Sequence, residues 1–250
     1  MIARPVLLSP ALPAHLIQHL IQHCTHPSTL IVCATRDDFL SVVAQHIIDE
    51  QQQHHQQQED ASPAPPPTTT AAAHLLAAPL FQVAVARHIR VVFAPTVSHL
   101  RAHLSVFSLD DSTVPAPPTT AAAAHSSSSA PPTPTPTLLI YGLLALHRET
   151  SEWSVQGLSG TAAVLVEAAA RVGMRAVVVE PRAYGEEVEL GQLLGDEVPI
   201  LSGGARRTGL ALRGGGWAGR TVEVKRVLAR WFDFREGGWD RGGEGEGEVM

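Results

Sequence analysis

The sequence predicts a single α/β domain, with a mostly parallel central sheet flanked by helices and an antiparallel hairpin near the C-terminus. Two observations carry this prediction. Short apolar runs alternate along the chain with segments whose apolar residues recur every three or four positions, which is typical of a parallel sheet covered by helices on both faces. The 250 residues, 44% of them hydrophobic, are enough for one sizeable core and marginal for two.

Five short apolar runs mark the strands of the expected sheet. The runs TLIVCA and IRVVFA are almost continuously apolar, as strands buried on both faces are. Cys33 in the first of these runs is expected to be a small buried side chain. The predicted strands are residues 5–8, 29–34, 89–94, 138–141 and 176–179.

Between these runs, apolar residues recur every three or four positions, as they do on one face of a helix. The clearest helix is predicted over residues 154–172, where Leu158, Leu165 and Ala169 share one face and Gly173 provides the C-terminal stop. The other predicted helices are residues 14–24, 37–48, 74–86 and 97–107.

The C-terminal part of the domain has a different pattern. Residues 208–213 and 220–228 are predicted to be two strands joined by a Gly-rich turn. Trp231 and Phe232 then adjoin on a strand and point to opposite faces. We expect one of them in the core, and the other either covered by a tail or helix, or exposed as an anchor for a partner.

Three segments lack any apolar period. Residues 51–73 consist largely of Gln, His, Pro, Thr and Ala, and residues 110–137 of Pro, Thr, Ala and Ser. Both are predicted to be disordered insertions that loop out of the domain, and the Gly/Glu-rich residues 236–250 are predicted to be a disordered tail. The folded domain is therefore expected to span residues 1–235.

The order of these elements resembles the RecA-like ATPase core found in recombinase paralogues. TLIVCATRDDFLSVVAQHI resembles the second strand and helix of that core, and IRVVFAPTVSHLRAHLSVF resembles the next strand and helix. LLIYGLLALHRETSEWSVQGLSGTAAVLVEAAARVGMRAVVVE resembles the Walker B strand, the following helix and the next strand, and GRTVEVKRVLARWFDF resembles the late hairpin. The resemblance covers roughly two-thirds of the chain and implies a RecA-like fold.

The chain departs from that family at both halves of the phosphate site. It contains no G-x-x-x-x-G-K-[ST] run, whose amides and Lys cradle the phosphates, and its first lysine is Lys225. Tyr141 and Gly142 stand where the Walker B carboxylate is expected. We therefore expect no ATP hydrolysis, no cofactor and no catalytic residue, all the more because no G-x-S-x-G elbow is present.

A histidine stripe is the one feature that could bind a metal. His15, His19 and His23 recur at every fourth residue, with Cys24 and His26 close by. No carboxylate or second cysteine completes a tetrahedral ligand set locally, so no metal site is expected.

The charge distribution gives mixed indications about nucleic acid. The net charge of −6 argues mildly against a chain that binds DNA alone, but most of the Lys and Arg residues lie in the second half. The resemblance implies that the loops at residues 148–154 and 182–208 face DNA, although the second loop also holds five acidic residues; the alternative is a solvated surface. The candidate contacts to DNA or a partner are Arg148, Trp153, Arg182, Arg206, Arg207, Arg220, Lys225, Arg226 and Trp231.

The function implied by the resemblance is that of a non-catalytic subunit, of the Shu type, in a hetero-oligomer with other RecA-like proteins. Such a complex supports homologous recombination and DNA repair in the nucleus and could contact single-stranded DNA. One alternative is an accessory subunit of Elongator, whose RecA-like ring serves transfer-RNA modification. The other is an α/β enzyme of unidentified chemistry. We expect no signal peptide, no membrane span and, with two cysteines, no disulfide framework.

Overall fold

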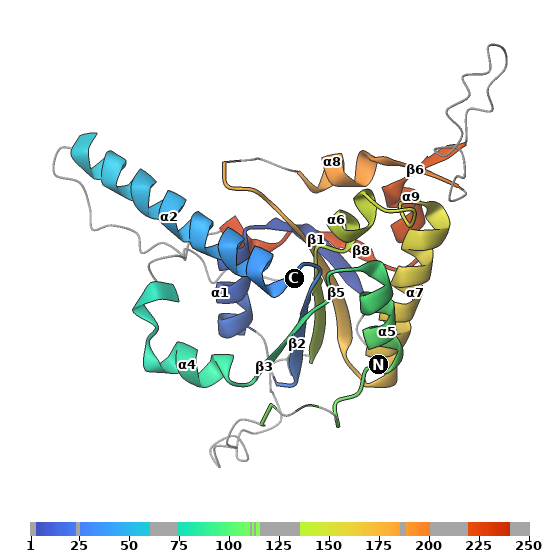
Figure 1. The fold of residues 1–250 in the computed structure, drawn as a ribbon, viewed down its shortest axis with the longest axis horizontal. Helices are drawn as coiled ribbons and strands as arrows, with labels where there is room; N and C mark the ends of the chain where they lie inside the picture. Colours follow the sequence, from blue (N-terminus) through green and yellow to red (C-terminus); the bar gives the residue numbers. More distant parts are fainter. Residues whose placement is uncertain are drawn as a thin grey trace, which may run out of the picture.

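The fold is built on one six-stranded sheet (Figure 1). The computed structural model describes residues 4–23, 26–60, 75–110, 112, 114–115, 136–185, 189–200 and 220–240. Its strands are β1 (Val6–Ala11), β2 (Ser28–Val32), β3 (Ile89–Phe93), β4 (Thr137–Tyr141), β5 (Arg175–Pro181) and β8 (Asp233–Arg235). They lie in the order β3-β2-β4-β5-β1-β8, and all neighbouring pairs are parallel. The predicted α/β class is confirmed, and the arrangement is consistent with a RecA-like one.

The predicted strands lie side by side in the sheet because their apolar runs supply buried side chains to both of its faces. Leu30 of β2 lies opposite Leu139 of β4, which in turn lies opposite Val177 of β5. The adjacent residues Ile31 and Ile140 point to the other face, and both are fully buried. The strands predicted over residues 29–34, 89–94, 138–141 and 176–179 therefore share one sheet, although β2 ends at Val32 and β3 at Phe93.

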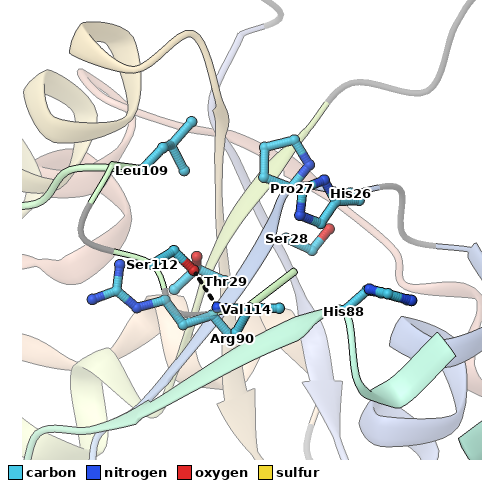
Figure 2. Close-up of a pocket in the computed structure, with 9 residues that line it drawn as sticks. All are labelled: His26, Pro27, Ser28, Thr29, His88, Arg90, Leu109, Ser112 and Val114. Carbon is cyan, nitrogen blue, oxygen red and sulfur yellow. Dashed lines mark hydrogen bonds between the residues drawn. The ribbon is translucent and has the colours of Figure 1, made fainter. Parts of the chain in front are cut away.

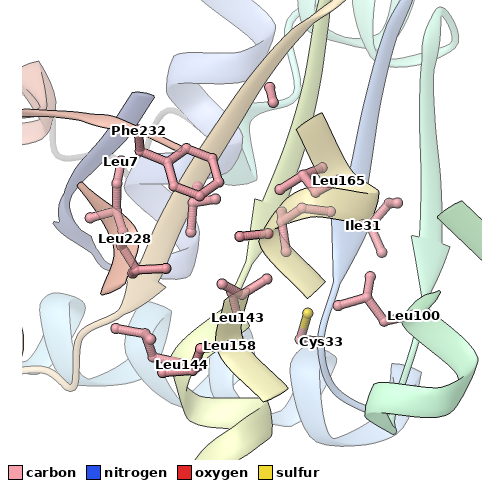
Figure 3. Close-up of a cluster of buried hydrophobic side chains, with 14 of the residues drawn as sticks. Leu7, Ile31, Cys33, Leu100, Leu143, Leu144, Leu158, Leu165, Leu228 and Phe232 are labelled. Carbon is pink, nitrogen blue, oxygen red and sulfur yellow. The ribbon is translucent and has the colours of Figure 1, made fainter. Parts of the chain in front are cut away.

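Helices cover both faces of the sheet. One face packs against α1 (Pro13–His23) and α2 (Arg36–Asp60), and α1 also contacts α4 (Leu80–Ala86). The other face packs against α5 (Val97–Ser105), α6 (Leu143–Arg148), α7 (Val155–Arg171), α8 (Leu190–Gly195) and α9 (Val224–Leu228). The larger hydrophobic core lies on this second face and includes Leu100, Leu143, Leu158 and Phe232 (Figure 3).

Helix α7 has the ends that the sequence predicts. The hydroxyl of Ser154 accepts a hydrogen bond from the amide of Gly157 at 3.1 Å, which caps the first turn. Gly173 ends the helix in the left-handed region, with φ +71°. Elsewhere the expected helix over 74–86 is divided by Pro79 into residues 75–77 and α4.

The C-terminal antiparallel pair exists, but different residues form it. It consists of β6 (Glu197–Pro199) and β7 (Thr221–Glu223). The predicted strand over 220–228 is wrong beyond Glu223, because Val224, Val227 and Leu228 have helical spacing and are buried as α9 against the core. The partner strand predicted at 208–213 lies outside the described residues.

The boundaries of the low-complexity segments also need correction. Helix α2 continues to Asp60, so residues 51–60 are helical where a disordered insertion was predicted; no Pro or Gly interrupts this part of the chain, whereas residues 61–73 lie outside the described part. The second insertion ends before Thr137, which already belongs to β4.

The predicted tail begins too early in the chain. Trp239 lies in a short 3₁₀ helix, η3 (Gly238–Asp240), packs against the smaller core and donates an indole hydrogen bond to the carbonyl of Ser9 at 3.0 Å. The fold therefore extends at least to Asp240. Among the described helices, none combines the length and the apolar character that crossing a bilayer requires.

Candidate functional site

The carboxyl end of β1 is closed by the chain itself. A single residue, Leu12, separates β1 from α1, and both Ala11 and Leu12 are buried. The carbonyl of Ala11 accepts a hydrogen bond from the Tyr141 hydroxyl at 2.9 Å and another from the Arg182 amide at 3.1 Å. The carbonyl at which β1 ends is thus satisfied by two donors of the chain itself.

Tyr141 and Gly142 occupy the end of β4, where a Walker B strand would carry a carboxylate. Tyr141 is buried, and this burial raises the pKa of its phenol, with the nearby Glu180 carboxylate acting in the same direction. Gly142 has φ +90°, and its amide donates to the carbonyl of Val179 at 2.9 Å. A Cβ at this position would lie 3.5 Å from the Cβ of Cys33, so β4 ends in a tight turn next to β2. Cys33 is buried, as expected, and this burial raises the pKa of its thiol.

Glu180 is a buried carboxylate that the sequence analysis missed. Its side-chain oxygens accept hydrogen bonds from the amides of Leu144 at 2.8 Å and Ala145 at 3.2 Å, at the start of α6. Burial raises its pKa to about 7, although the hydrogen bonds from α6 lower it. A carboxyl group of this kind can act as a general acid or base, but here only 2% of the residue is exposed and both oxygens are engaged by backbone amides. The arrangement therefore fits a role in joining β5 to α6.

Four of the predicted contact residues are found around α6 and α9. Arg148 pairs with Asp196 and lies 5.2 Å from the ring centre of Trp153, itself partly buried against the larger core. Lys225 and Arg226 are exposed on α9. The Arg148–Asp196 pair connects α6 to the residue between α8 and β6, and α8 contacts α9; Figure 1 shows α8, α9 and β6 close together.

The other predicted contact residues are placed differently. Arg220 is exposed next to β7, whereas Arg182 follows β5 and affects the electrostatics of His46 on α2. Trp231 lies in the turn after α9, not on a strand; its indole donates to the hydroxyl of Ser159 at 3.3 Å, and its ring packs against the same core as Phe232. Arg206 and Arg207 lie outside the described residues.

The histidine stripe on α1 divides into two groups. His19 stacks on His23 with 4.4 Å between ring centres and meets Trp239 edge-on at 4.7 Å. Burial lowers the pKa of His19 to about 4, and the charge of His23 adds to this effect. His15 instead faces α2, where its ring centre lies 5.5 Å from that of His46. The stripe is thus a packing surface at one end and part of a second cluster at the other.

That second cluster consists of His15, His46 and Glu50. Each offers one ligand-type atom, and these atoms all lie within 4.8 Å of one another. His46 and Glu50 were not predicted as ligands because they lie on a different helix from the stripe. Their spacing of four residues was the available signal, although the helix predicted over residues 37–48 ended before Glu50.

The described residues line two pockets near the amino end of the sheet. One of about 200 Å³ lies beside the first residues of β2 and β3 (Figure 2) and is lined by His26, Pro27, Ser28, Thr29, His88, Arg90, Leu109, Ser112 and Val114. The other, of about 360 Å³, includes His19, His23, Arg175 and Trp239. Ligands of open parallel sheets bind outside the carboxyl ends of the strands, so neither pocket has the usual position. In the first, the Arg90 guanidinium is already engaged with the Ser108 carbonyl at 3.1 Å.

Comparison with known proteins found no relative: no protein-family model, no curated protein and no solved structure matches this chain.

Proposed function

We propose that this chain is a non-catalytic RecA-like subunit that neither binds nor hydrolyses ATP. On this proposal it assembles with other RecA-like proteins into a nuclear complex that supports homologous recombination and DNA repair. The observation that carries the proposal is the hydrogen bond from the Tyr141 hydroxyl to the Ala11 carbonyl, which closes the carboxyl end of β1.

The position of this hydrogen bond matters because a P-loop lies between a strand and the helix that follows it. Residues 29–47 resemble the second strand and helix of a RecA-like core, so β1 and α1 stand in the place of the first pair. A phosphate-binding loop needs several backbone amides and a lysine. Here the connection offers Leu12 alone, and Pro13, which begins α1, has no amide hydrogen.

The energetic consequence for nucleotide binding is large. Each charge-assisted hydrogen bond to a phosphate that is missing costs about 1.5–3 kcal/mol, and about 1.4 kcal/mol is a factor of ten in affinity. The loss of two or three such bonds moves a micromolar dissociation constant into the millimolar range or beyond.

The docking part of the proposal is supported by exposed apolar side chains on α2 and α4. Leu40 and Val42 on α2 are 47% and 54% exposed, and Leu80 and Phe81 on α4 are 89% and 60% exposed. Both helices contact α1, so the four side chains belong to the same side of the sheet. Exposed large apolar side chains of this kind are candidates for a protein–protein contact. The choice of a recombination complex rests on the resemblance to recombinase paralogues.

Two measurements test the proposal. Calorimetric titration of the purified protein with Mg-ATP is expected to show no binding at micromolar concentrations; micromolar binding would overturn the non-catalytic assignment. Affinity purification with mass spectrometry is expected to recover RecA-like recombination proteins, whereas recovery of the Elongator ring in their place would refute the pathway.

A matched pair of variants tests the docking surface. Phe81→Ser should reduce partner recovery, because it removes an exposed apolar side chain from α4. Val106→Ser serves as the control, since Val106 is 73% exposed and lies at the end of α5 on the opposite side of the sheet. Equal recovery with the two variants would rule out the α2–α4 surface.

A further inference from the structure

The cluster of His15, His46 and Glu50 brings together three metal-binding side chains from two helices. His46 and Glu50 are four residues apart on α2, so they lie on one face of that helix. His15 comes from the neighbouring helix α1, which packs against α2. Donor atoms from the three side chains lie within 4.8 Å of one another.

The burial of His46 is the second observation that points to a ligand. Only 3% of this residue is exposed, and neither Nδ1 nor Nε2 has a hydrogen-bond partner among the residues that the structure describes. A buried polar group without a partner costs free energy, so such groups are rare in folded proteins. An imidazole that keeps both nitrogens free of protein partners is suited to donate a lone pair to a metal ion.

The distances are compatible with coordination after small side-chain movements. Zinc binds imidazole nitrogen and carboxylate oxygen at about 2.0–2.2 Å, which places tetrahedral ligands about 3.4 Å apart. The ligand atoms are therefore at most about 1.4 Å further apart than a bound zinc ion requires. Rotation about side-chain bonds can supply this movement without displacing α1 or α2.

The charges around the cluster also bear on a cation. Glu50 and the adjacent Asp49 act on His46 as negative charges, while Arg182 acts as a positive one. Two carboxylates against one guanidinium leave the surroundings favourable for a divalent ion. The ring of Tyr184 lies 5.2 Å from that of His46 and shields this side of the cluster.

We propose that His15, His46 and Glu50 bind a divalent transition metal, with zinc as the preferred ion. Two imidazole nitrogens select zinc-like metals over magnesium or calcium, which prefer oxygen ligands. Three protein ligands leave a fourth position for water or for a group from a partner. The bound ion joins α2 to α1. This proposal does not depend on whether the protein binds ATP or on which partner it contacts. None of the three ligands belongs to the proposed docking surface or to the closed end of β1.

Calorimetric titration of the metal-free protein with zinc chloride tests the proposal. The wild-type protein is expected to bind one zinc ion tightly. His46→Gln and Glu50→Gln should each weaken this event on the order of 100-fold or more, since each removes a ligand. The control is His23→Gln, which removes an exposed histidine from α1 and should leave the tight event unchanged. All variants keep the other histidines of the chain, so weak binding elsewhere contributes equally.

A second measurement does not depend on any variant. Crystals of the wild-type protein grown with zinc should show an anomalous peak about 2.0–2.2 Å from donor atoms of His46 and Glu50. The proposal is overturned if wild-type protein shows no tight event, if His46→Gln retains it, if His23→Gln loses it, or if the peak lies elsewhere.

Discussion

Titration of the Glu180 carboxyl group is expected to change the free energy of unfolding of this fold measurably. The carboxyl group is fully buried at the end of β5, with a pKa raised to about 7 from an ordinary value of 4.5. Between these two values the folded protein holds a proton that the unfolded chain releases. Because the folded state binds more protons in this range, the free energy of unfolding must fall as the pH rises.

The size of the effect follows from the difference between the two pKa values. One pKa unit corresponds to about 1.36 kcal/mol, so the full contribution is about 3 kcal/mol. Between pH 5 and pH 8, where most of the change occurs, the contribution is about 2–3 kcal/mol. It is present at low pH and is lost as the pH rises through about 7.

Several histidines titrate in the opposite direction. Burial lowers the pKa values of His19, His46 and His147, so their protonation destabilises the fold as the pH falls. The wild-type pH profile alone therefore cannot isolate Glu180. The variant Glu180→Gln removes the carboxyl group and keeps the histidines, so the difference between the two profiles reports Glu180.

The assay is urea unfolding of wild type and Glu180→Gln at a series of pH values. The free energy of unfolding of the wild type, relative to that of Glu180→Gln, should fall by about 2–3 kcal/mol between pH 5 and pH 8. Glu167→Gln is the control, because this residue lies on the exposed side of α7 and its pair with Arg171 is worth less than about 1 kcal/mol. A difference between wild type and Glu180→Gln that does not change with pH would refute the reasoning.

Three further changes test other parts of the fold, each by urea unfolding. Tyr141→Phe should cost about 1 kcal/mol, because the β1 carbonyl keeps its second donor; an unchanged free energy of unfolding would contradict the buried bond. Gly142→Ala should cost about 1–2 kcal/mol through its positive φ, whereas Gly191→Ala within α8 should be neutral or stabilising; a harmless Gly142→Ala would refute the strained turn. Trp239→Ala should cost about 2 kcal/mol, since the ring is partly buried; no loss would show that the end of the chain does not stabilise the fold.

Local patterns along the chain were enough to predict the fold class and most of the elements. Apolar runs such as TLIVCA have the period and length of buried strands, and the spacing of Leu158, Leu165 and Ala169 is that of a helix face. These signals depend only on residues that are near one another in the chain. They therefore predict strands and helices without knowledge of which elements pack together. The missing P-loop is likewise a property of the chain, because that motif is continuous in sequence.

Local patterns failed where a segment was short or where tertiary packing decided its structure. Residues 224–228 were predicted as part of a strand over residues 220–228, but burial of Val224, Val227 and Leu228 against the core favours the helix α9. Trp239 lies in a Gly-rich segment with no apolar period, and its packing against α1 and β1 depends on residues more than two hundred positions away.

The candidate sites were decided by the tertiary structure alone. The stripe of His15, His19 and His23 lacks a carboxylate in its own helix, and only the packing of α2 against α1 brings His46 and Glu50 to His15. The closing of β1 by Tyr141 likewise joins residues 130 positions apart. A sequence states which groups a chain carries, but distances between remote groups are set by the packing of helices on a sheet, which no local pattern encodes.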